Sequence, residues 1–177
     1  SSLGPDKKLK LVIKTKNNFQ NPFLILASRT WSLSITQDLK QGDHSTIDLY
    51  VESNITPMYI DLIGMGESSD YDDDREVCQT YEDVCRDIMD TINWLKENKG
   101  VDTISLMGVS ASTLPVLMFA ARHPKLIDKI VIQGIPKTSK EEYVNVPLPT
   151  YAGNKYKINL NRYLYRKYRD LPQDRIA

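Results

Sequence analysis

Residues 108–112 (Gly-Val-Ser-Ala-Ser) have the types and spacing that could do chemistry. They follow an apolar run at residues 103–107 and precede a segment with helical spacing that ends near Arg122. A serine at a sharp turn between a strand and a helix has an exposed hydroxyl, and the crowded turn requires small residues two positions before and after it. Gly108 and Ser112 meet that requirement. We therefore predict that Ser110 is a nucleophile that attacks an acyl carbonyl.

The helix that starts at this turn would stabilise the negative charge that develops on the acyl oxygen. Backbone N–H groups in the first turn of a helix lack intrahelical acceptors, and the helix dipole favours negative charge there. The N–H of Ala111 is the first oxyanion donor by this argument. The alternative interpretation makes Ser110 an ordinary N-cap residue, because serine is favoured at helix starts regardless of chemistry.

The elements that must position Ser110 alternate between strand and helix. Apolar or alternating runs predict strands at residues 9–16, 22–27, 58–63, 103–107 and 129–133, and helical spacing predicts helices at 31–39, 81–99 and up to 122. Thr80 and Asp83 form a capping-box pattern at the start of the second helix, and Gly100 ends it. This order predicts an α/β fold with a mostly parallel central sheet and helices on both faces.

Length and charge exclude several other classes of protein. The chain has 177 residues, enough for one domain or a large part of a bigger one, and its 23 basic and 23 acidic residues cancel. The balance disfavours a strongly basic nucleic-acid binder, and no apolar stretch is long enough to span a membrane. Cys78 and Cys85 are seven residues apart on one predicted helix, about 10.5 Å along its axis, too far to form a disulfide. Reduced thiols favour a cytoplasmic location.

Other site motifs fail at specific positions. Glycines 64 and 66 follow a strand as in a dinucleotide-binding turn, but Ser69 occupies the third glycine position and the acidic residues 70–74 would repel a pyrophosphate. The same acidic run begins like a calcium-binding loop, yet Arg75 and Tyr81 occupy the positions of its glycine and its chelating glutamate. The two cysteines have no other metal ligand spaced nearby. We predict no metal and no cofactor.

With these motifs, the chain resembles the α/β-hydrolase superfamily over about residues 9–136. The serine turn is similar to the G-x-S-x-G motif of that family, with Ser112 replacing the last glycine. Residues 61–68 are similar to its D-x-x-G-x-G-x-S loop, and residues 121–124 (Ala-Arg-His-Pro) to its helix exit. The resemblance implies a serine hydrolase or acyltransferase that acts on a small ester, thioester or amide through an acyl-enzyme on Ser110.

The resemblance also implies a division of the chain. Residues 1–136 would be the N-terminal part of the hydrolase core, and residues 137–177 the start of a helical lid. This last segment contains nine Lys or Arg and four Asp or Glu residues, and six of the ten tyrosines. Cations beside tyrosines could also contact nucleic acid or an anionic membrane. A lid that packs its tyrosines over the sheet is the simpler interpretation, so neither of those partners is predicted.

Two departures from the family pattern affect the site. The family often has His-Gly after its first central strand, whereas this chain has Leu-Ala-Ser-Arg-Thr-Trp at residues 26–31. The second oxyanion donor would then come from Ser28 or Arg29, although Arg29 could instead bind an anionic group of the substrate. The only histidines are His44 and His123, and neither is at the place of the catalytic histidine.

We therefore expect a second polypeptide or a C-terminal fragment to supply the acid and the histidine and to complete the sheet. Without it, the sheet would have an open edge and uncovered apolar faces. We expect the isolated 177 residues to be poorly soluble or to form a stable complex. The alternative function is a binding or scaffold module that has the fold but lacks the catalytic triad.

Overall fold

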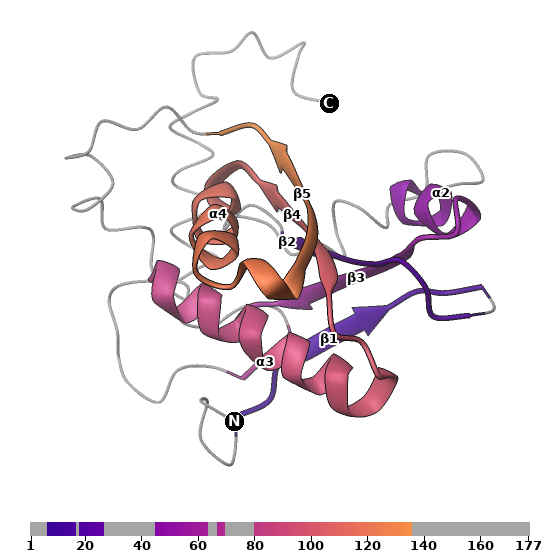
Figure 1. The fold of residues 1–177 in the computed structure, drawn as a ribbon, viewed down its shortest axis with the longest axis horizontal. Coiled ribbons are helices and arrows are strands. Elements are labelled where there is room, and N and C mark those ends of the chain that lie inside the picture. Colours follow the sequence, from indigo (N-terminus) through magenta and orange to yellow (C-terminus); the bar gives the residue numbers. More distant parts are fainter. Residues whose placement is uncertain (1–6, 17, 27–44, 64–66, 70–79, 136–177) are drawn as a thin grey trace, which may run out of the picture.

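The structure is a computed structural model that describes residues 7–16, 18–26, 45–63, 67–69 and 80–135 (Figure 1). The strands are β1 Lys10–Ile13, β2 Pro22–Leu26, β3 Thr56–Asp61, β4 Ile104–Val109 and β5 Ile127–Gln133. The α-helices are α2 Thr46–Glu52, α3 Tyr81–Lys99 and α4 Thr113–Arg122, and two short 3₁₀ turns are η1 Ser110–Ser112 and η2 Pro124–Leu126. The predicted helix at 31–39 and the predicted lid at 137–177 lie outside the described residues.

The strands form one five-stranded sheet in the order β1-β3-β2-β4-β5. β2 pairs in parallel with β3 and with β4, and β4 pairs in parallel with β5. β1 is antiparallel to β3 and lies at one edge, and β5 lies at the other. The prediction of a mostly parallel sheet is confirmed.

Helices pack on both faces of this sheet, as predicted. Successive side chains of a strand point to opposite faces, and in β2 Leu24 packs into one apolar cluster while Ile25 packs into the other. The first cluster includes buried residues of α3 and α4, and the second includes Ile47 of α2. Figure 1 shows α3 and α4 side by side against the sheet, with α2 set apart from them.

Local sequence signals explain where α3 begins and ends. The Thr80 hydroxyl accepts the N–H of Asp83 at 3.2 Å, and the Asp83 carboxylate accepts the N–H of Thr80 at 2.8 Å, so the predicted capping box is present. Gly100 ends the helix with a φ of 65°, a left-handed conformation that glycine adopts without steric cost. Within the described ranges, no helix is both long and apolar enough to cross a lipid bilayer.

The structure differs from the sequence prediction at one helix and at the ends of several strands. Strand β1 is shorter than the predicted 9–16, β4 continues to Val109, and β5 begins at Ile127. Helix α2 was not predicted, although Ser45 and Asp48 form the same capping box as Thr80 and Asp83. Strand β3 begins at Thr56 and ends at Asp61, two residues earlier than predicted. It starts earlier because Thr56 and Pro57 already pair with β2 at its first two residues.

Candidate active site

A single left-handed residue, Ser110, connects strand β4 to the helix that follows it. Val109 is extended (φ −110°, ψ 125°), Ser110 has a φ of 54°, and Ser112 is helical (φ −79°, ψ −7°). In a residue with positive φ, the Cβ atom crowds the backbone, so residues with side chains adopt this conformation mainly where a turn must be sharp. The turn leaves the Ser110 side chain exposed at the end of a buried strand.

The underside of this turn is closely packed. A Cβ atom at Gly108 would lie 2.8 Å from the carbonyl oxygen of Ser112 and 2.8 Å from the Cα of Thr113. Both contacts are with backbone atoms, which a side-chain rotation cannot relieve, so only glycine fits at position 108 in this geometry. Ser112 and Thr113 are almost fully buried beneath the turn.

Thr113 holds the carbonyl group of Ser110. Its backbone N–H donates to the Ser110 oxygen, closing the η1 turn, and its hydroxyl donates to the same oxygen. Sequence reasoning did not identify Thr113, because residue types alone do not show which carbonyl a hydroxyl reaches. Its position three residues after the serine was the available signal, since Ser and Thr often bond backbone groups three or four residues earlier.

The carboxyl ends of β2, β3 and β4 lie at the same end of the sheet, and Ser110 lies at that end. Leu26, the last residue of β2, pairs with Gly108 of β4, so the chain leaves β2 beside the serine turn. In open parallel sheets, ligands bind at the carboxyl ends of the strands. Ser28 and Arg29, the predicted second oxyanion donors, follow β2 but lie outside the described residues, so their roles stay predictions.

Hydrogen bonds hold the described residues on both sides of the turn after β3, at the same end of the sheet. The Asp61 carboxylate accepts the N–H of Glu67 at 3.0 Å, and the Ser68 hydroxyl donates to the Asp61 carbonyl. The Asp87 carboxylate of α3, almost fully buried, accepts the N–H of Ile63 at 3.0 Å. These contacts give the acidic start of the D-x-x-G-x-G-x-S motif a structural role in anchoring the loop.

A family model for the alpha/beta hydrolase fold matches residues 59–173, more than half of the chain. The chain belongs to this family. The match includes the loop after β3, the serine turn of β4 and strand β5. No curated protein matches the sequence.

Solved structures share the fold at low sequence identity. A marine microorganism esterase is 18% identical with a TM-score of 0.53, and 72% of this chain aligns with 41% of that one. A carboxylesterase of Nitrososphaera gargenis is 17% identical with a TM-score of 0.59, at 93% and 52% coverage. A CIB-like hydrolase from Thermoplasma acidophilum is 16% identical with a TM-score of 0.57, at 72% and 57% coverage. This α/β-hydrolase chain therefore spans about half the length of these relatives.

His123 of this α/β-hydrolase is at the wrong end of α4 to act on Ser110. It follows Arg122 as the C-cap, and its ring packs on Phe119 with 4.8 Å between the ring centroids. The ten residues of α4 separate it from the serine turn by about 15 Å. This placement agrees with a structural role at the helix end. His44 lies outside the described residues.

Cys85 is not in a position to act as a nucleophile. Its side chain is buried between α3 and α4, where the thiol contacts the Pro115 carbonyl oxygen at 3.6 Å. Burial, and secondarily the nearby Glu82 carboxylate, raises the pKa of this thiol to about 11. A thiol that stays protonated at neutral pH is a poor nucleophile and a poor metal ligand. Among the described residues, no three His, Cys, Asp or Glu side chains gather where they could hold a metal ion.

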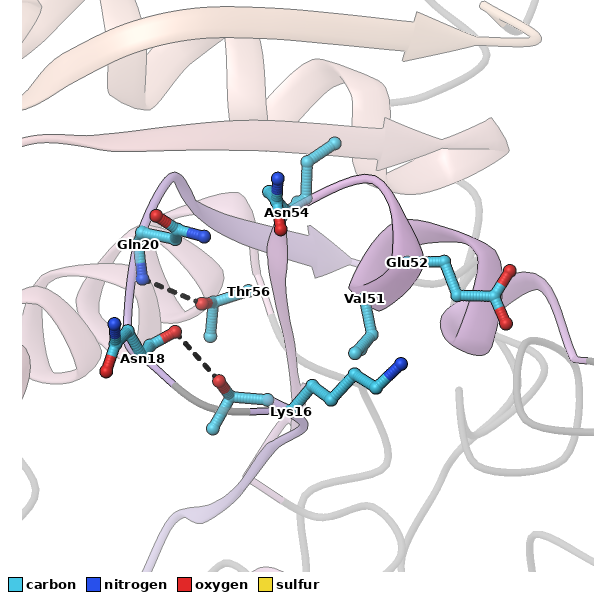
Figure 2. A pocket seen from close by; sticks show the side chains of 9 residues that line it. Lys16, Asn18, Gln20, Val51, Glu52, Asn54 and Thr56 are labelled. Carbon is cyan, nitrogen blue, oxygen red and sulfur yellow. Dashed lines mark hydrogen bonds between the residues drawn. The ribbon is translucent and has the colours of Figure 1, made fainter.

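A cavity of about 450 Å³ lies where β2 and β3 begin, whereas Ser110 lies at the other end of the parallel strands. Figure 2 shows the residues that line this cavity. It is lined by the turn before β2 and the turn before β3, including Asn18, Gln20 and Thr56. Its polar groups bond one another: the Thr56 hydroxyl accepts the N–H of Gln20 at 3.0 Å, and the Thr15 hydroxyl donates to the Asn18 carbonyl at 2.9 Å. The cavity is therefore not part of the candidate active site.

Proposed function

We propose that this chain is the N-terminal part of a serine hydrolase in which Ser110 forms an acyl-enzyme. The observation that carries the proposal is the left-handed conformation of Ser110, with a φ of 54°. Backbone strain of this kind costs on the order of 1–3 kcal/mol and is concentrated at active sites. An ordinary N-cap serine has extended backbone angles, as Ser45 and Thr80 have at the starts of α2 and α3.

The proposed reaction is acyl transfer to Ser110 and then to water. Ser110 Oγ attacks the carbonyl carbon of an ester, thioester or amide as a histidine takes its proton. The N–H of Ala111, helped by a donor from the loop of Ser28 and Arg29, stabilises the oxyanion. When the tetrahedral intermediate collapses, the bond to the leaving group breaks, and the leaving alcohol, thiol or amine takes the proton from the histidine. Water, deprotonated by the same histidine, then releases the carboxylic acid and regenerates Ser110.

The acid and the histidine are proposed to come from a C-terminal segment or a second polypeptide. His123 is excluded as the base by its place at the far end of α4. Strand β5 supports this view, because among the described strands it lies at the edge of the sheet, and its apolar residues Ile130 and Val131 are 40% and 43% exposed. A further strand paired in parallel with β5 would cover that edge and would place its own carboxyl-end loop at the same end of the sheet as Ser110.

The test uses the whole protein that contains this chain, treated with a serine-directed fluorophosphonate and examined by intact-mass spectrometry. We expect one adduct per molecule, at Ser110, and hydrolysis of p-nitrophenyl esters. Both should be lost in Ser110→Ala and retained in Ser53→Ala, a control at an exposed serine after α2. A native mass that includes a second polypeptide would identify the source of the histidine. A folded protein with no adduct and no ester hydrolysis would refute the proposal and favour the binding-module function.

A further inference from the structure

We propose that Thr113 is a positioning residue that aims the N–H of Ala111 at the oxyanion. The inference rests on the proposed function, because it concerns the donor that Ser110 chemistry would use. It assigns a role to a residue that is neither the nucleophile nor a donor to the substrate.

Two groups of Thr113 bind one carbonyl oxygen of the turn. The Ser110 oxygen accepts both the backbone N–H and the hydroxyl of Thr113. A single 3₁₀ hydrogen bond has poor geometry and allows the peptide to tilt. A second donor from a side chain rooted in the same residue restricts that tilt.

The planarity of the peptide bond relates this carbonyl to the next N–H. The carbonyl of Ser110 and the N–H of Ala111 belong to one peptide unit, and in a trans peptide these two groups point in opposite directions. Fixing the carbonyl toward Thr113 therefore fixes the Ala111 N–H in the opposite direction, away from the body of the helix. The carbonyl that accepts two hydrogen bonds also polarises its peptide unit, which strengthens the N–H as a donor.

Packing around Thr113 holds its side chain in place. Its side chain has no exposed surface, and its Cα lies so close to Gly108 that a Cβ there would be 2.8 Å away. A β-branched residue near the start of a helix also has few χ1 rotamers, and one of the two that threonine uses in helices lets its hydroxyl reach a carbonyl in the preceding turn. The hydroxyl is therefore held against the Ser110 oxygen by the packing around it.

The test compares Thr113→Val, which keeps the shape and removes the hydroxyl, with Thr113→Ser, which keeps the hydroxyl. Thr91→Val is the matched control, because the buried Thr91 hydroxyl also donates to a carbonyl of its own helix, that of Asp87 at 2.8 Å. Each variant of the whole protein is measured for the rate of fluorophosphonate labelling per folded molecule. The kcat and KM for a p-nitrophenyl ester and the amide NMR shift of Ala111 are measured as well.

We expect Thr113→Val to lower the labelling rate and kcat about tenfold, a part of the 10²–10³-fold loss that follows removal of an oxyanion donor. KM and the pH profile should be unchanged, the Ala111 amide should shift, and Thr113→Ser should restore the wild-type values. Thr91→Val should change stability alone.

Two failures are distinguishable. If wild-type protein reacts at Ser110 and Thr113→Val reacts equally fast, the positioning role is overturned while the proposed function stands. If wild-type protein does not react at Ser110, both are overturned. An Ala111 amide that does not respond to Thr113→Val refutes the role through the geometry, independently of activity.

Discussion

Replacing Ser110 by glycine should abolish labelling and activity and at the same time stabilise the protein. Ser110 has a φ of 54°, and a left-handed residue with a side chain costs roughly 1–2 kcal/mol that glycine does not incur. Glycine also makes the unfolded chain more flexible, which lowers the free energy of unfolding by about 0.4–1 kcal/mol. The expected net gain is therefore about 0.5–1 kcal/mol.

Ser110→Ala separates the effect of the backbone from that of the hydroxyl. Alanine removes the nucleophile but keeps the Cβ that causes the strain, so its free energy of unfolding should stay near that of the wild type. In a thermal melt, the melting temperature of the glycine variant should exceed that of the alanine variant by about 1–4 °C, since 1 kcal/mol corresponds to about 2–4 °C in chains of 150–250 residues.

Asn54 provides a control for the left-handed conformation. It has a φ of 57° outside the candidate site, and asparagine tolerates this conformation better than other residues with side chains. Asn54→Gly should therefore raise the melting temperature less than Ser110→Gly does. If Ser110→Gly is no more stable than Ser110→Ala, Ser110 is not strained, and its backbone conformation does not support a role as nucleophile.

Three further predictions concern the packing and charges around the turn. Gly108→Ala should destabilise the protein by about 1–3 kcal/mol in urea unfolding and slow Ser110 labelling, because the new Cβ meets two backbone atoms at 2.8 Å; unchanged stability would contradict the packing. In a Cys78→Ser background, Cys85 should not react with a thiol reagent at pH 8 until the protein unfolds. Burial raises the pKa of Cys85 from 9.0 to about 11, so the free energy of unfolding should be constant below pH 9 and should decline as the pH rises to about 11. Fast labelling of Cys85 in the native protein would contradict its burial. Arg122 hydrogen-bonds both Glu82 oxygens, at 2.7 and 2.9 Å, and lowers the Glu82 pKa, so Arg122→Gln should raise that pKa in a carboxyl NMR titration, and no change would exclude the pair in solution.

Sequence predicted the parts of the fold that depend on neighbouring residues. The apolar run of residues 22–26 and the capping box of Thr80 and Asp83 are local signals, and the structure has both elements. Helix α2 was missed because it has only seven residues, too few for a recognisable helical period. The strand order and the antiparallel direction of β1 depend on pairings between distant residues, such as Lys10 with Asp61, which no local pattern encodes.

At the serine turn, the sequence indicated where small residues are required but not which atoms they contact. The pattern favoured a glycine at position 112, and the serine there weakened the motif. In the structure Ser112 is helical with a φ of −79°, so position 112 does not need the left-handed freedom of glycine. The steric demand falls on Gly108, which faces the Ser112 backbone rather than its side chain.

The same geometry bears on the choice between an enzyme and a binding module. A turn that only joins a strand to a helix is more stable with glycine at the left-handed position, because glycine removes the strain. Here a serine occupies it, exposed, above a tight contact at Gly108 and beside a carbonyl held by two donors from Thr113. These contacts stabilise a conformation in which the exposed Ser110 precedes the first N–H groups of the helix. Labelling of the wild-type protein at Ser110, together with a stability gain in Ser110→Gly, would favour the enzyme, and a stability gain without any wild-type labelling would favour the binding module.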